Sequence, residues 1–66
     1  METANEILQT ALMKEKRARD FYEGLVLHCR VETVRQLLER LRDEEAKHVK
    51  MIETMLSRLR LGHDPA

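Results

Sequence analysis

The scarcity of turn-forming residues is the feature that most limits how this chain can fold. Two glycines and one proline are spread over 66 residues, and the only aromatic residues are Phe21 and Tyr22. A β-sandwich or barrel needs many turns between short strands, and this sequence has no residues to form them. We therefore expect an all-α protein with a few long helices in a single domain over residues 1–66.

Apolar residues that recur at spacings of three and four predict two helices. The expected contact stripe of the second helix comprises Val34, Leu37, Leu38, Leu41, Ile52, Met55, Leu56 and Leu59. The first helix is expected over about residues 4–28 and the second over about residues 33–61, with a turn at about 29–32. So short a connection makes the two helices antiparallel neighbours, which is a helical hairpin.

Capping signals mark the ends of these helices. Thr3 and Glu6 have the spacing of a capping box at the first helix, and Thr33 and Gln36 repeat this spacing at the second. A glycine and a proline in the short tail, residues 62–66, are the stop signal expected after a helix.

Charge and cysteine usage exclude several classes of protein. Twelve basic residues balance twelve acidic ones, which argues against a nucleic-acid partner. No stretch is apolar enough for a membrane span, and we see no secretory leader. Cys29 is the single cysteine, so an internal disulfide and a Cys-x-x-Cys metal site are excluded. A cytoplasmic location is expected from this thiol usage.

Three ionisable residues interrupt the apolar stripes: Glu15 in the first helix, and Glu45 and His48 in the second. Glutamate is almost never buried unless it is paired or binds a metal. The point midway between Glu15 and either of the other two residues falls in the expected turn. In an antiparallel hairpin, we therefore expect all three side chains to meet at one level.

Carboxylate oxygens with an imidazole nitrogen suit iron, manganese or zinc better than calcium or magnesium. A hairpin of this size buries little by itself, so we expect it to form a homodimer. Two hairpins in a four-helix bundle supply four carboxylates and two imidazoles, the ligand set of di-iron and di-manganese carboxylate bundles. Four negative charges would then balance two divalent ions.

The residues now described resemble the rubrerythrin branch of the ferritin-like superfamily. The matching segments are residues 15–22, with their Glu-x6-Tyr spacing, and residues 43–48, which end in Glu-x-x-His. The resemblance implies a non-haem di-iron centre, with two iron ions per dimer and manganese or zinc as alternatives. It also implies an oxidoreductase of the ferroxidase or peroxidase type, with Fe(II) and O₂ or peroxide as substrates.

Carried over by position, the resemblance makes Glu15 and Glu45 carboxylate ligands and His48 a nitrogen ligand. Tyr22 corresponds to a tyrosine near the site, which could hydrogen-bond a ligand carboxylate. Typical members have two helix pairs, a rubredoxin-like domain and a further glutamate where this chain has Ala18. These departures imply a site shared between two chains and no built-in electron donor. They also favour ferroxidase or oxygen chemistry over efficient peroxidase chemistry.

Other interpretations remain open at this stage. The hairpin could be a metal-free structural or partner-binding module, although this leaves three ionisable residues at one buried level unexplained. A structural zinc or manganese site would use the same ligands. Glu44 could replace Glu45 as a ligand, but Glu44 lies off the apolar stripe.

Overall fold

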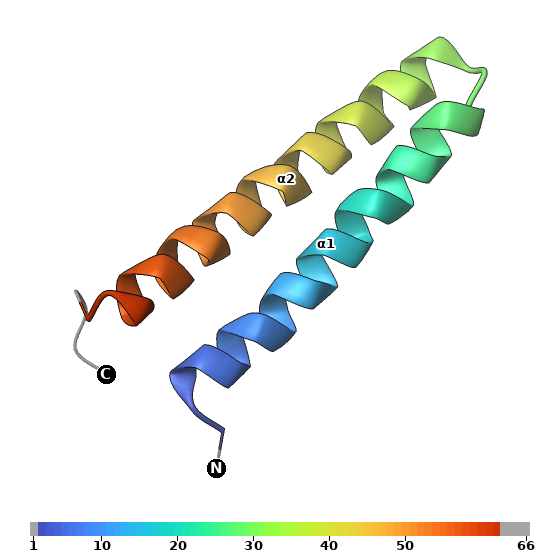
Figure 1. The fold of residues 1–66 in the computed structure, drawn as a ribbon. Coiled ribbons are helices and arrows are strands. Elements are labelled where there is room, and N and C mark those ends of the chain that lie inside the picture. Colours follow the sequence, from blue (N-terminus) through green and yellow to red (C-terminus); the bar gives the residue numbers. More distant parts are fainter. Residues whose placement is uncertain (1, 63–66) are drawn as a thin grey trace.

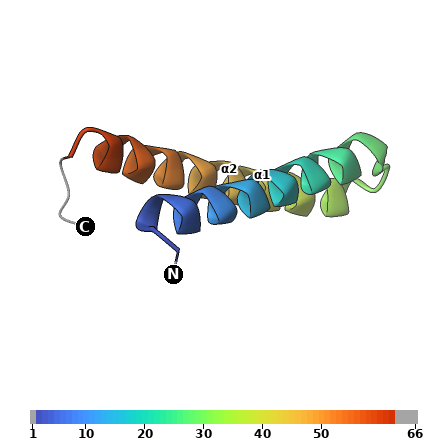
Figure 2. The same ribbon diagram turned by 60° about the horizontal axis from the view of Figure 1, so that its bottom comes forward.

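The computed structural model describes residues 2–62 and contains two antiparallel helices, α1 (Ala4–His28) and α2 (Glu32–Arg60) (Figure 1). The helices pack along their length as a hairpin that measures 47 × 21 × 12 Å (Figure 2). The expectation of an all-α hairpin is therefore confirmed. Neither helix, within the described residues, is both long and apolar enough to cross a membrane.

The first turn of α1 is closed by a capping box. The Glu6 amide donates to Thr3 Oγ1 over 3.1 Å, and the Thr3 amide donates to Glu6 Oε1 over 3.2 Å. Two of the amide groups that the first turn leaves without helical partners are satisfied in this way. This cap depends only on residues three apart, which is why it could be expected from the sequence.

The start of α2 differs from the expectation. The helix begins at Glu32, and the N-cap is Val31, which makes no side-chain capping bond. Thr33 therefore lies inside the first turn and cannot cap it, so the capping box expected at Thr33 and Gln36 is wrong. The Gln36 side chain instead donates to Glu32 Oε1 over 3.2 Å. Beyond the other end of α2, Gly62 has a φ of 72°, which closes the helix as a left-handed residue.

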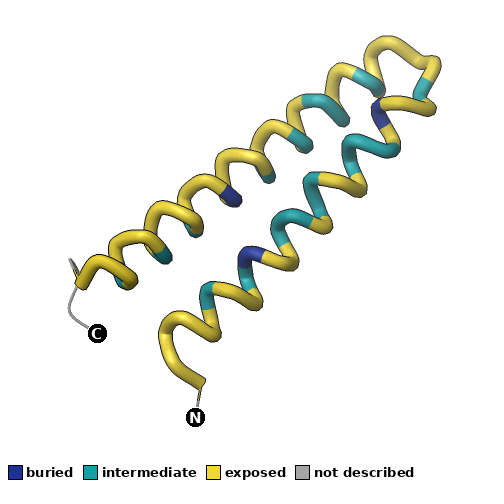
Figure 3. Tube along the Cα trace, in the orientation of Figure 1, coloured by how far each residue is buried: buried dark blue, intermediate teal, exposed yellow. Residues whose placement is uncertain are grey.

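The two helices contact each other along one stripe of residues on each, which we call the seam. Its most buried members are Leu12 and Val26 of α1, each 9% exposed, and Val49 of α2, 5% exposed (Figure 3). The remaining seam residues are half-buried, and they are Leu8, Glu15, Arg19 and Tyr22 of α1 and Leu38, Arg42, Glu45, Ile52, Leu56 and Leu59 of α2.

The seam of α2 matches the expected stripe only in part, at Leu38, Ile52, Leu56 and Leu59. Val34 and Leu41 were expected to face the first helix, but both are exposed, and Val49 takes the central position. The apolar surface of α2 is wider than one line of contact. The line of residues through Leu38, Val49 and Ile52 packs against α1. The neighbouring apolar residues of α2, such as Val34 and Leu41, are left uncovered.

A second apolar stripe lies on the same side of both helices, and we call it the apolar face. Its seven large residues are 36–68% exposed. Each stripe lies about 90° around its helix from the seam, since successive residues are about 100° apart. The helices run in opposite directions, so both rotations lead to one side of the hairpin. The apolar face comprises Ile7, Ala11, Ala18 and Leu25 of α1 and Val34, Leu37, Leu41, Met51 and Met55 of α2.

The opposite side of the hairpin carries ion pairs between the helices. Arg42 Nη1 lies 3.0 Å from Glu23 Oε2, and Lys16 Nζ lies 3.9 Å from Glu53 Oε2. The hairpin therefore has one charged side, which suits water, and one apolar side.

Candidate metal centre

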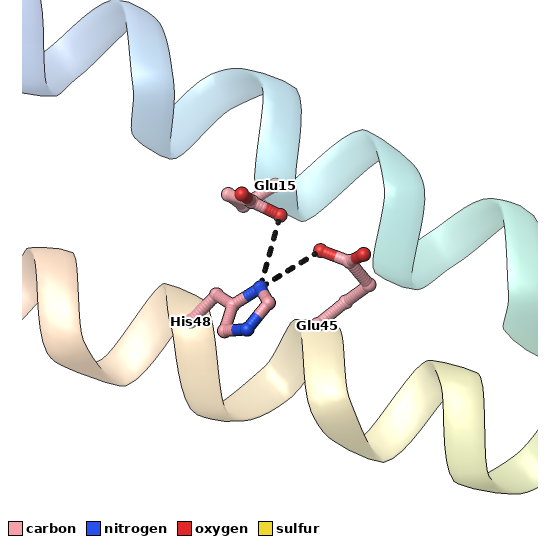
Figure 4. Close-up of side chains that lie close together, drawn as sticks. All are labelled: Glu15, Glu45 and His48. Atoms are coloured by element: carbon pink, nitrogen blue, oxygen red, sulfur yellow. Dashed lines mark ion pairs between the residues drawn. The ribbon is translucent and has the colours of Figure 1, made fainter.

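Glu15, Glu45 and His48 meet near the middle of the hairpin (Figure 4). Glu15 extends from α1, while Glu45 and His48 extend from α2, one helical turn apart. One ligand atom from each of the three residues lies within 4.8 Å of the others. The expected meeting of the three side chains is confirmed, because their distances along the chain from the connection match.

The separations within this cluster fit ligands around an ion better than they fit hydrogen bonds. His48 Nδ1 lies 3.5 Å from Glu45 Oε2 and 3.7 Å from Glu15 Oε2. Hydrogen bonds of this kind are shorter, at about 2.7–3.2 Å. Two ligand atoms that are each about 2.0–2.2 Å from one metal ion lie roughly 3.0–3.5 Å apart. The observed distances therefore leave room for a small ion.

Glu45 Oε2 is the buried atom of the cluster that lacks a hydrogen-bond partner in the described residues. A buried carboxylate oxygen without a partner is unfavourable, because it has lost water and gained nothing in return. A cation at this point would satisfy the oxygen, so the residues present fit a metal ion.

The two carboxyl groups also influence each other's charge. The Glu15 side chain, which can share a proton with Glu45 in a hydrogen bond, is the main cause that raises the pKa of Glu45 above its ordinary 4.5. Loss of water adds to this increase, as does repulsion from Glu15, and His48 opposes it. Without a cation the cluster therefore tends to keep a proton, which a metal ion would displace.

The cluster lies at the border between the seam and the apolar face. The side chains of Glu15 and Glu45 are 29% and 21% exposed, whereas that of His48 is 46% exposed. His48 lies in the same series of α2 as Leu41 and Met55 of the apolar face. Its imidazole is thus less covered than the sequence suggested, and one side of the cluster is open where a second hairpin could pack.

Two glutamates and one histidine make half of the ligand set known from di-metal carboxylate bundles. Oxygen and nitrogen donors of this kind suit iron, manganese or zinc. A single hairpin can hold a metal ion with these three groups alone, but it cannot supply the four carboxylates and two imidazoles of a di-metal centre.

Among the described residues, Glu44 and His28 offer the same kinds of donor atom but do not join the cluster. Glu44, the alternative to Glu45, is exposed, and Lys47 donates to it over 3.2 Å. His28 Nδ1 lies 2.8 Å from the carbonyl oxygen of Gly24, far along α1 from the cluster. His63 lies outside the described residues.

Tyr22 lies on the seam two turns after Glu15. Its ring packs edge to face with Phe21, with 5.5 Å between the ring centroids. In the described part of the chain, its hydroxyl makes no hydrogen bond with Glu15 or Glu45. A bond from Tyr22 to a ligand carboxylate therefore stays a prediction.

Arg42 is a charged residue on the seam that was not expected there. Arg42 precedes Glu45 by three residues, so the two lie one turn apart on the same face of α2. Its guanidinium donates to Glu23 on α1 and to Asp43, each over 3.0 Å. The three-and-four spacing through Leu38, Arg42 and Glu45 was the signal that could have revealed it.

Comparison with known proteins identifies the family. The sequence model of the rubrerythrin family matches residues 6–66, which include all three residues of the cluster. No curated protein and no solved structure matches the chain. The family match spans both helices and agrees with the hairpin and with its group of carboxylates and imidazole. The chain therefore belongs to the rubrerythrin family, a ferritin-like family whose members typically bind iron.

Proposed function

We propose that this chain is a non-haem di-iron oxidoreductase whose metal site forms between two hairpins. The observation that carries the proposal is the meeting of Glu15, Glu45 and His48 around a buried oxygen without a partner. The site would hold two iron ions per dimer, with manganese or zinc as alternatives. Fe(II) and O₂ or peroxide are the proposed substrates, and the single thiol suits a reducing, cytoplasmic location.

The apolar face supports the dimer. It borders the cluster on the side where His48 is exposed, so a second hairpin packed there would bring its own three ligands to the same place. The cluster lies near the middle of both helices, which lets two hairpins overlap along their whole length. Burial of this face would also give the dimer the apolar core that one hairpin lacks.

The charges of the ligands suit a pair of divalent ions. Two copies of Glu15 and Glu45 carry four negative charges, which two divalent cations balance in a site of low polarity. Glu15 and Glu45 would bind or bridge the ions through oxygen, and His48 would bind through nitrogen. Bound iron supplies electrons for the reduction of O₂ or peroxide. The apolar residues around these ligands would keep bulk water from the site.

The side chain of Ala18 bears on whether the site favours ferroxidase or peroxidase chemistry. Ala18 lies one turn after Glu15 and cannot bind a metal. The site therefore has three ligand groups per chain and no further carboxylate from this position. This supports ferroxidase or oxygen chemistry rather than efficient peroxidase chemistry.

Iron content and mass in solution test the proposal together. Protein purified with Fe(II) should contain about one iron ion per chain and behave as a dimer. The Glu45→Ala variant should lose the iron, while Glu44→Ala, which removes the neighbouring exposed carboxylate, should keep it. Retention of two metal ions per dimer by Glu45→Ala would disprove the assignment.

A metal-free structural or partner-binding hairpin is the second candidate, and the exposed apolar face favours it equally. This candidate predicts a dimer or complex that takes up no iron when Fe(II) is added without oxygen. The near-ultraviolet spectrum after oxidation separates the two functions, because oxidised di-iron sites absorb there and an empty bundle does not.

A further inference from the structure

We propose that Arg42 and Glu23 form a positioning pair, which sets how far α2 lies along α1 and so brings Glu45 and His48 opposite Glu15. The metal-binding part of this inference rests on the proposed function. The alignment of the two helices is independent of the proposed function, because the alignment can be measured in the metal-free protein.

The contact between Arg42 and Glu23 is more direct than that between Lys16 and Glu53, which also joins the two helices. Arg42 Nη1 donates to Glu23 Oε2 over 3.0 Å, and the Arg42 side chain is only 25% exposed. Hydrogen bonds to Asp43 and Glu23 raise the pKa of Arg42 above its usual value. The pair of Lys16 and Glu53 is longer, at 3.9 Å, and both of its side chains are more exposed.

The rest of the seam specifies the alignment weakly. Its apolar members are mainly leucine, valine and isoleucine, which repeat every three or four residues and could pack again after a shift of one turn. Arg42 acts differently, since its partner on the other helix, Glu23, lies opposite it in the observed alignment only. A single polar residue in the core of a coiled coil selects alignment in the same way.

Both shifted alignments are unfavourable for Arg42. One turn before Glu23 on α1 lie Arg19 and Asp20, which pair with each other over 3.1 Å, and one turn after it lies Val26. A shift in one direction would bring Arg42 to Arg19, a like charge, beside an Asp20 carboxylate that Arg19 already binds. A shift in the other would bring Arg42 to Val26, which is buried and apolar and would leave the guanidinium without its partner.

A shift of one turn would also take the cluster apart. One turn advances a helix by about 5.4 Å. His48 Nδ1 lies only 3.7 Å from Glu15 Oε2, so such a shift would separate the ligand of α1 from the ligands of α2. Arg42 and Glu45 lie one turn apart on the same helix and move together. Arg42 thus acts on the metal site through alignment and not by touching the metal.

The variant Arg42→Met tests the alignment, and the chain supplies a matched control in Arg35→Met. Arg35 lies seven residues earlier on the same face of α2, but it pairs with Glu32 and Glu39 within its own helix. Methionine favours helices, and an apolar residue in place of a partly buried charge is often tolerated. Circular dichroism establishes that both variants are folded.

Spin labels report the alignment directly. Cysteines at the exposed positions Thr10 and Arg40, in a Cys29→Ser background, carry one label on each helix, away from the apolar face. Labelled protein is mixed with excess unlabelled chain so that each assembly contains one labelled chain. The parent and Arg35→Met should give one distance between the labels. Arg42→Met should give a second, because a shift of one turn moves one label about 5.4 Å along the axis.

Two further variants complete the test. Glu23→Gln should give the same second distance from the other helix, and Arg42→Lys, which keeps the charge, should restore the single distance. Anaerobic Fe(II) titration should show about a tenfold loss of affinity in Arg42→Met. Loss of a residue that orients a metal ligand typically lowers metal affinity by about 10-fold to 100-fold, and we expect the smaller effect. Arg35→Met should bind Fe(II) as the parent does.

A single, unchanged distance in both Arg42→Met and Glu23→Gln would overturn the inference. If the parent binds no Fe(II), the proposed function fails, and the label distances still decide whether the pair aligns the helices.

Discussion

Glu15 of α1 and His48 of α2 face each other in the middle of the hairpin, with 3.7 Å between Glu15 Oε2 and His48 Nδ1. The contact joins two helices whose only covalent link is a short connection. It places a carboxylate and an imidazole beside Glu45, whose buried oxygen has no hydrogen-bond partner among the described residues.

The variant Glu15→Gln should weaken metal binding and leave the metal-free hairpin at least as stable. Glutamine keeps the shape of the side chain but removes the negative charge that binds a cation and repels Glu45. Anaerobic Fe(II) titration and thermal unfolding of the metal-free protein measure the two effects. Glu53→Gln, which removes a carboxylate from the charged side, should bind Fe(II) like the parent. An unchanged affinity in Glu15→Gln would remove Glu15 from the site.

The contribution of Glu45 to the stability of the metal-free protein should fall as the pH rises through the pKa of this residue. This pKa is raised in the folded chain above the ordinary value of 4.5, mainly by Glu15. Glu45 therefore contributes to stability while its carboxyl is protonated. This contribution is full at a pH below the pKa of Glu45 in the unfolded chain, and it is lost as the pH rises through the pKa of Glu45 in the folded chain. Thermal unfolding of the parent and of Glu45→Gln from about pH 4 to about pH 7 should show this loss as the difference between the two profiles.

Glu45→Gln should remove this part of the pH dependence, since glutamine does not titrate. Glu44→Gln is the control, because Glu44 is exposed and pairs only with Lys47. Both variants keep His48, whose charge opposes the effect of Glu15 on Glu45. Identical pH profiles for the parent and Glu45→Gln would contradict the prediction. Fe(II) affinity should rise over the same pH range, because the ion displaces the proton.

A charge on the apolar face should prevent the dimer from forming. Leu37→Glu places a carboxylate among Val34 and Leu41, where a second hairpin would bury it without a partner. Analytical ultracentrifugation should find a monomer, and iron analysis should find little bound iron. Leu27→Glu is the matched control: Leu27 is also exposed but lies away from this face. A dimer in the Leu37→Glu variant would place the interface elsewhere.

The centre of the seam should contribute more to stability than exposed apolar residues do. Val49 is the most buried residue of α2, and Val49→Ala should lower the free energy of unfolding by about 1–3 kcal/mol. Val31 is exposed before the start of α2, and Val31→Ala should change it by less than about 0.5 kcal/mol. Urea unfolding of the metal-free protein measures both. Equal effects would mean that the seam is not centred on Val49.

Much of the site could be predicted because its determinants are regular. In two continuous helices joined by a short turn, the distance of a residue from the turn sets its level along the hairpin. The meeting of Glu15, Glu45 and His48 follows from this rule. The three-and-four spacing of the second helix could place Arg42 on the seam, but its pairing with Glu23 could not be predicted in the same way, because the pairing depends on which face of α2 lies against α1.

The sequence by itself determined the helices, the cap formed by Thr3 and Glu6, and the level at which the three ligands meet. These features depend on residues near one another in the chain or on the constant rise of a helix. Only the tertiary structure decided that Val49 rather than Leu41 faces α1, and that Arg42 reaches Glu23. The physical reason is that α2 carries more apolar surface than one neighbouring helix can cover. The spacing of apolar residues in α2 does not determine which part of this surface α1 covers.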